Sequence, residues 1–126
     1  MLFRSVIYVF DVTTGALIHS IHKPGAETSS AWFGTSVKID NDVIIASAPQ
    51  DRASDANTLS GNVYIIDAVT GAVLKEIENP SAYGTRYADR FGNSVSISGD
   101  YAIVGASLED DAGGSGSGKT YIFQAG

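Results

Sequence analysis

The sequence contains the same pattern twice, and a third copy begins near its end. An apolar run, an aspartate and a Thr-Gly-Ala step occupy residues 7–16 and recur at residues 63–72. A shorter run, Thr-Tyr-Ile-Phe, occupies residues 120–123. The tyrosines of successive runs are 56 and 57 positions apart. A fixed period of this length predicts repeated structural units that stack on one another.

A second pattern follows the same period. A Phe-Gly step and two apolar runs fill residues 33–48 and recur 58 positions later at residues 91–106. The offset changes between Pro80 and Phe91 and again before Gly118. Variation in length therefore falls in connecting segments, where loops tolerate it.

Composition indicates a globular chain. Of the 126 residues, 44% are hydrophobic and 17% are charged, which is typical of folded rather than disordered proteins. The net charge of −6 and the pI of about 4.6 argue against a nucleic-acid partner, which requires a basic face. The sequence has no cysteine, and no run approaches the roughly 18 apolar residues of a membrane-spanning helix.

The segments between the connections are predicted to be β-strands. Serines alternate with Val95 and Ile97, which is the period of a strand with one buried face. Continuously apolar runs, such as residues 43–46, are expected in strands that are covered on both faces. The predicted strands are residues 6–11, 16–21, 34–39, 42–48, 62–67, 72–77, 92–98, 101–106 and 119–123.

Four strands to a repeat predict an all-β fold made of antiparallel, four-stranded β-propeller blades. The chain would supply about two and a quarter blades, not closed within this chain. The expected division is a non-native leader at 1–5, the last two strands of a preceding blade at 6–24, a complete blade at 33–80, and an incomplete blade lacking its last strand at 91–126. Because closed propellers have four to eight blades, we expect a fragment of a larger propeller whose open faces associate.

Residues 91–107 resemble an FG-GAP repeat, and residues 33–49 resemble a second, diverged copy. Such repeats build the integrin α-subunit propeller and many bacterial extracellular proteins. The resemblance therefore implies a propeller that is extracellular or at the cell surface, as in bacterial secreted proteins. Residues 67–74 are similar to the strand hairpins of pyrroloquinoline-quinone-type propellers.

Integrin-type blades often carry a calcium loop of the Asp-x-Asp-x-Asp-Gly kind between their two inner strands. The corresponding links here are only residues 40–42 and 98–100. These short links cannot supply the six to eight oxygen ligands that calcium prefers. The calcium site of the family is therefore not transferred to this chain.

Acidic residues gather in the two segments that follow the inner strands. The candidate metal ligands are Asp51, Asp55, Glu109, Asp110 and Asp111. One interpretation is a solvated acidic rim. The other is a weak calcium site built from side chains and loop carbonyls. The spacing of the acids differs between the copies, which favours the rim, and no other cofactor is expected.

The segment before the second Phe-Gly step offers a candidate ligand surface, formed by Arg86, Tyr87, Asp89 and Arg90. The alternative interpretation is a polar linker whose aromatic residue packs on the sheet. Trp32 precedes the other Phe-Gly step, and we expect it to seal neighbouring blades.

Other patterns give no catalytic site. Residues 113–120 match a phosphate-binding pattern by letter, but that loop works only at the start of a helix, and a strand is predicted to follow. His19 and His22 are three apart on a predicted strand, so they point to opposite faces and cannot chelate one metal. Asp11 and Asp67 precede turns, where aspartates accept backbone N–H groups.

The leading hypothesis is a non-enzymatic, extracellular interaction or adhesion scaffold that is part of an FG-GAP propeller. One alternative is the propeller portion of a secreted enzyme or quinoprotein-like protein. Another is a short protein that assembles a ring from several copies. The expected partners are a protein or glycan ligand, and neighbouring blades of the parent protein or self-association through open blade faces. Neither nucleic-acid binding nor membrane insertion is expected.

Overall fold

The structure is a computed structural model, and it describes residues 6–24, 32–49, 61–80, 91–107 and 118–125. In these residues it contains nine β-strands and no helix, arranged in three antiparallel sheets. The first sheet is β1 (Val6–Phe10) and β2 (Leu17–His22); the second is β3 (Val37–Asp40), β4 (Val43–Ala48), β5 (Asn62–Asp67) and β6 (Val73–Glu78); the third is β7 (Phe91–Ser98), β8 (Tyr101–Ala106) and β9 (Lys119–Gln124).

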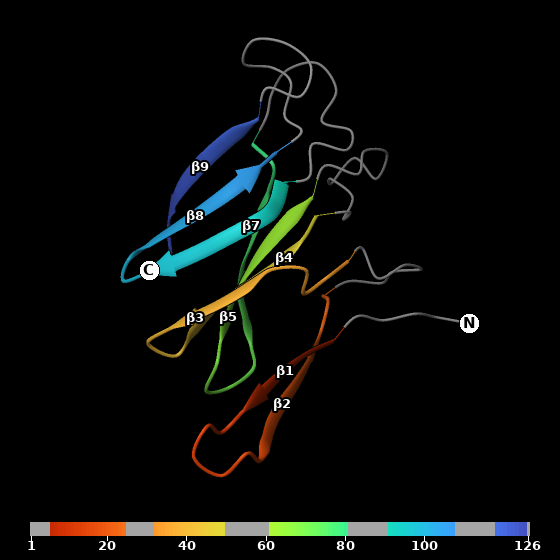
Figure 1. Cartoon of the computed structure of the whole chain (residues 1–126), viewed down its shortest axis with the longest axis vertical. Helices are drawn as coiled ribbons and strands as arrows, with labels where there is room; N and C mark the ends of the chain where they lie inside the picture. Colours follow the sequence, from red (N-terminus) through yellow and green to blue (C-terminus); the bar gives the residue numbers. More distant parts are fainter. Residues whose placement is uncertain (1–5, 25–31, 50–60, 81–90, 108–117, 126) are drawn as a thin grey trace, which may run out of the picture.

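Within each sheet, consecutive strands are neighbours, and the three sheets lie on one another in chain order (Figure 1). The predicted all-β architecture of open, antiparallel sheets is confirmed. The other strand boundaries lie within one residue of the predicted ones, but β3 begins at Val37, three residues after the predicted start at residue 34. Before Val37 the chain forms a turn, in which Gly34 N donates to the Ser47 carbonyl at 2.8 Å.

The second sheet is covered on both faces. In β5, Tyr64 and Ile66 belong to the apolar cluster shared with the first sheet, whereas Val63 and Ile65 belong to the cluster shared with the third. All four side chains are buried. Successive strand residues point to opposite faces, so a strand between two neighbours must be apolar at every position. The continuous apolar runs of the sequence have this cause.

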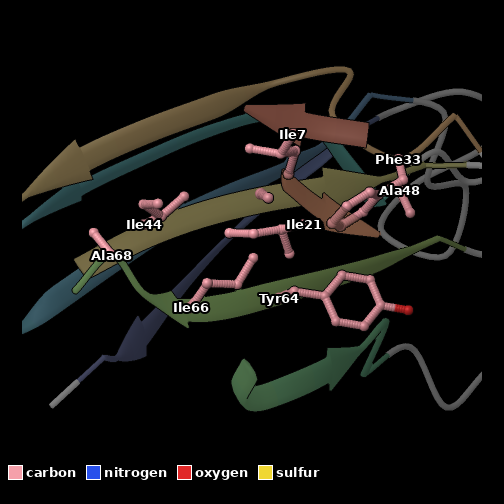
Figure 2. Packing of buried hydrophobic residues seen from close by; sticks show 9 residues of the cluster. Ile7, Ile21, Phe33, Ile44, Ala48, Tyr64, Ile66 and Ala68 are labelled. Atoms are coloured by element: carbon pink, nitrogen blue, oxygen red, sulfur yellow. The ribbon is translucent and has the colours of Figure 1, made fainter. Parts of the chain in front are cut away.

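Figure 2 shows the cluster between the first and second sheets. Ile7 and Ile21 from β1 and β2 pack towards Ile44, Tyr64 and related residues of the second sheet. Phe33, from the turn before β3, completes the cluster. Each sheet is too thin to form a core alone, so the core of this chain lies between the sheets.

Phe91 occupies the corresponding place between the second and third sheets. Its side chain is fully buried, and its ring meets the Tyr121 ring edge to face at 5.5 Å between centroids. One repeat earlier, Phe33 meets Tyr64 in the same manner, also at 5.5 Å. The repeat in the sequence is therefore a repeat in packing. Such edge-to-face pairs contribute about 0.5–1.5 kcal/mol beyond the burial of area.

Gly92 is needed for the close approach of the third sheet. A Cβ atom placed there would lie 2.8 Å from Ser47 Cβ and 3.2 Å from Val63 Cγ2, and the residue has a φ of +93°. Any side chain would therefore push β7 away from the second sheet. This contact gives a physical reason for the glycine that follows the phenylalanine.

Two hydrogen bonds also join the second and third sheets. Val95 N donates to Ser36 Oγ at 3.3 Å, and Gly99 N donates to Asp40 Oδ2 at 2.7 Å. The two accepting side chains lie at opposite ends of β3, Ser36 just before it and Asp40 at its last position. They help to fix the position of β7 along the second sheet, in an interface whose core is apolar.

We predict that Gly92→Ala destabilises the chain more than Gly99→Ala. Both glycines have positive φ, but a Cβ at Gly99 meets nothing within 4 Å. The control, Gly99→Ala, should lower the free energy of unfolding by about 1 kcal/mol, because alanine disfavours the left-handed backbone conformation. Gly92→Ala should cost roughly 1–3 kcal/mol more because of overpacking against Ser47. Urea unfolding followed by circular dichroism measures both; equal losses would contradict the packing role of Gly92.

Candidate functional site

The turns that join β1 to β2, β3 to β4, β5 to β6 and β7 to β8 gather at one end of the sheets, here called the turn end. The Asp42 carbonyl accepts from Ala68 N at 2.8 Å, which ties the β3–β4 turn to the β5–β6 turn. One repeat later, the Asp100 carbonyl accepts from Ala125 N at 2.6 Å. The turn end is therefore held together by its own backbone.

Asp11 and Asp67 have equivalent structural roles in this region. Asp67 Oδ1 accepts from Val69 N at 2.8 Å and Thr70 N at 3.3 Å. Asp11 Oδ1 makes the matching pair of bonds with the N–H groups two and three residues on, at 2.8 and 3.2 Å. The predicted turn role of both aspartates is confirmed, and their carboxylates are occupied by backbone donors.

His19 has a structural contact that the sequence did not indicate. It is half-buried on β2, and its Nε2 lies 2.8 Å from the Val69 carbonyl oxygen of the second sheet. Because a carbonyl can only accept, Nε2 donates the proton. Its repeat partner Lys75 is exposed, so the repeat pattern does not indicate this contact. His22 is exposed at the end of β2, three residues from His19.

The phosphate-binding letter pattern has no helix after it. Lys119 and Thr120 begin β9, as expected from the sequence. Lys119 Nζ lies 5.3 Å from the centroid of the Tyr121 ring, a cation–π distance. A strand presents none of the aligned N–H groups that a helix N-terminus offers to a phosphate.

Trp32 does not seal the interface as predicted. Half of its surface is exposed, and the buried residue is the next one, Phe33, at 4%. Trp32 has a φ of +59°, and its carbonyl accepts from Thr35 N at 3.1 Å. This tight turn brings Phe33 into the cluster instead.

The sequence-predicted site residues lie outside the described residues. This holds for the candidate metal ligands Asp51, Asp55, Glu109, Asp110 and Asp111, and for the candidate ligand surface Arg86, Tyr87, Asp89 and Arg90. Among the residues that the structure does describe, no group of three or more His, Asp or Glu side chains could hold a metal ion.

The described residues that flank these segments lie at one end of the sheets, opposite the turns. Ala106 pairs with both Phe91 and Lys119, so the residues that flank segments 81–90 and 108–117 are adjacent. The backbone of Gly61, which follows segment 50–60, lies against that of Phe91. We call this the loop end; it is the place to which all three segments attach.

An apolar groove follows β1 and β3, where the first sheet has only two strands. Val37 and Ile39 in its wall are 44% and 60% exposed, whereas their repeat equivalents Val95 and Ile97 are 3% and 8% exposed. The difference arises because β3 and β4 cover Val95 and Ile97, and no described strands take that place in the first sheet.

Stacked antiparallel sheets, joined by a buried Phe-Gly step at a fixed period, are the blades of a β-propeller. A model of the FG-GAP repeat matches residues 26–66 and 81–123, together more than half of the chain. The chain therefore belongs to the FG-GAP repeat family. No curated protein matches it. In the part of the chain that the structure describes, no helix is long and apolar enough to cross a membrane.

We predict that Asp67→Ala lowers the free energy of unfolding by about 1 kcal/mol, whereas Asp67→Asn changes it by less than half as much. The alanine removes the acceptor of two backbone N–H groups, and asparagine keeps an oxygen in the same place. Chemical denaturation of the two variants measures the difference. Equal losses would show that these hydrogen bonds do not stabilise the turn.

We predict no calcium-specific rise in melting temperature. A site in segments 50–60 and 108–117 with a Kd near 1 mM would add about 1.4 kcal/mol at about 10 mM calcium, or several degrees. Melting in calcium chloride should match melting in the same concentration of magnesium chloride. A rise of several degrees that Asp110→Asn/Asp111→Asn abolishes would contradict the acidic-rim interpretation.

Proposed function

We propose that the chain is a non-enzymatic interaction module of an extracellular or cell-surface FG-GAP protein. In this proposal the segments at the loop end form the contact surface for a protein or glycan ligand. The sheets hold the ends of those segments in fixed positions. The family assignment makes an extracellular setting a reasonable expectation, because many proteins with these repeats act outside the cell.

The observation that carries the proposal is the close packing of the strand ends at the loop end. Ala106 pairs with Phe91, which follows segment 81–90, and with Lys119, which lies just after segment 108–117. The two segments therefore begin and end close together. Recognition sites are commonly built from several loops on a rigid β-framework. Here the framework is the third sheet: Ala106 lies in β8, which is hydrogen-bonded to β7 on one side and to β9 on the other.

The chemistry of the described polar residues supports a scaffold rather than an enzyme. Asp11 and Asp67 accept backbone N–H groups, Asp40 accepts from the third sheet, and His19 donates to a turn carbonyl. Each of these groups therefore has a structural partner. Ser47 Oγ likewise accepts from Ser36 N at 3.1 Å. A catalytic role would require these groups to leave bonds that hold turns and sheets together.

The proposal predicts that Arg86 and Arg90 contribute directly to binding. Guanidinium groups pair strongly with carboxylates and sulfates of acidic glycans and proteins. We expect Arg86→Ala/Arg90→Ala to weaken binding roughly tenfold or more, as loss of a central arginine contact does. The measurement is surface plasmon resonance with the purified chain on a panel of extracellular-matrix proteins and acidic polysaccharides.

The matched control is Lys38→Ala/Lys75→Ala, which removes the same charge from two exposed strand positions. The control should bind like the parent chain. Equal weakening in both double variants would indicate general electrostatics, and no binding to any member of the panel would count against adhesion. The location is tested independently by adding protease to intact cells that produce the protein and then detecting the chain. An extracellular or cell-surface chain should be digested.

A further inference from the structure

The third sheet has an outer face, which points away from the second sheet. Ala102, Val104 and Ala106 of β8 are fully buried on the side of the second sheet, so the residues between them point outward. Strand pairing arranges the outward residues in three rows across the sheet. The rows are Ser94–Gly105–Thr120 nearest the loop end, Ser96–Ile103–Ile122 in the middle, and Ser98–Tyr101–Gln124 nearest the turn end.

The outer face carries no charged side chain in these three rows, although the whole chain has a net charge of −6. An unpaired charge is the most costly group to remove from water. Two acidic copies of the chain can therefore meet at this face without burying a charge on either side.

The face is hollow at one end and projects at the other. In the row nearest the loop end, Gly105 has no side chain, and a pocket of about 450 Å³ lies there between Ser94 and Thr120. A Cβ atom at Gly105 would meet nothing nearer than 3.8 Å. In the row nearest the turn end, the side chain of Tyr101 is 60% exposed. Between the two ends, Ile103 is 46% exposed.

This pattern is complementary to itself. Consider a two-fold axis that lies in the plane between two such faces and crosses β8 at Ile103. Tyr101 and Gly105 are each two residues from Ile103, about 6.8 Å along the strand. The half-turn therefore brings Tyr101 of a second copy over Gly105 of the first. A contact across a two-fold axis is made twice, so both tyrosines meet a pocket.

We propose that two copies of this chain associate through the outer faces of their third sheets as a symmetric dimer. Tyr101 of each copy enters the pocket over Gly105 of the other, and Ile103 and Ile122 pack around the axis. A buried tyrosine needs a partner for its O–H group, and the hydroxyl groups of Ser94 and Thr120 in the pocket can accept that proton.

The area of the face predicts a weak, reversible dimer. Three strands spaced about 4.8 Å apart, with six residues each at about 3.4 Å, cover roughly 300 Å² in projection. Stable interfaces bury about 800 Å² of accessible surface on each partner. The dimer should therefore form in the upper part of the micromolar-to-millimolar range of concentration. The proposal does not depend on the adhesion role, because it involves no ligand at the loop end.

The first test is sedimentation equilibrium of the full chain from micromolar to millimolar concentration. Tyr101→Ala should raise the dimer Kd roughly tenfold or more, as loss of a central aromatic contact does. The matched control is Tyr8→Ala in β1, where the parent side chain is 57% exposed against 60% for Tyr101. The control should dimerise like the parent chain.

Two further substitutions act at the pocket and at the axis. Gly105→Leu should fill the pocket and abolish the dimer. Ile103→Asp should also abolish it, because it places two carboxylates beside the axis. Its control is Ile18→Asp on β2, where the parent side chain is 49% exposed. Far-UV circular dichroism verifies that each variant is folded.

Cross-linking tests the symmetry without disturbing the face. The chain has no cysteine, so a single introduced cysteine reports its own neighbours. Ser96→Cys lies in the middle row, and a short bis-maleimide should link two copies of this variant. Ser98→Cys should not link to itself, because its two equivalents are about 14 Å apart along the strands. A mixture of Ser98→Cys and Ser94→Cys should link.

The proposal is overturned if the chain stays monomeric at millimolar concentration, or if folded Gly105→Leu dimerises like the parent chain. It is also overturned if Ile18→Asp abolishes the dimer and Ile103→Asp does not, since the interface would then be on the first sheet. Linking of Ser98→Cys to itself, without linking of Ser96→Cys, would exclude the two-fold arrangement.

Discussion

The burial of one phenylalanine between two sheets is the interaction on which this fold depends. A single four-stranded sheet has no interior, so its apolar side chains are buried only by a neighbouring sheet. Phe91 is fully buried in this way, and burying such a side chain contributes about 1.5–3 kcal/mol. Gly92 makes the burial possible by letting the two backbones approach. The stability of the chain is therefore a sum over interfaces between neighbouring sheets.

This dependence explains why equivalent residues differ so much in exposure. Tyr64 in the second sheet is 1% exposed, whereas Tyr8, its equivalent in the first sheet, is 57% exposed. The two residues share a repeat position, but β5 lies between β4 and β6 and faces the first sheet, whereas β1 pairs only with β2 among the described strands. Ile65 and Ile122 show the same contrast at the other end of the stack. Burial here is a property of the neighbour, not of the residue.

The sequence predicted the features that depend on local pattern. Alternation of apolar residues predicted the strands, and the aspartate before each Thr-Gly step predicted the turn bonds that Asp67 makes. It failed where a contact joins distant positions. Phe33, not Trp32, fills the interface because a left-handed turn at Trp32 decides which aromatic enters. The contact of His19 was missed because nothing in its own strand indicates the Val69 carbonyl opposite it.

The repeat also separates stability from recognition. Where side chains are buried between sheets, the period is fixed, because one inserted residue would turn every later side chain to the other face. The length changes fall instead in the segments before Phe91 and Gly118. The pairing of Ala106 with Lys119 holds the two ends of the second segment together, so strand pairing already offsets the entropy cost of closing the loop. Since doubling the length of a connection between fixed ends costs only about 0.6 kcal/mol, the chain tolerates changes of length at these places. The framework can therefore support many different contact surfaces, and the repeat pattern that specifies this fold carries no information about which ligand is bound.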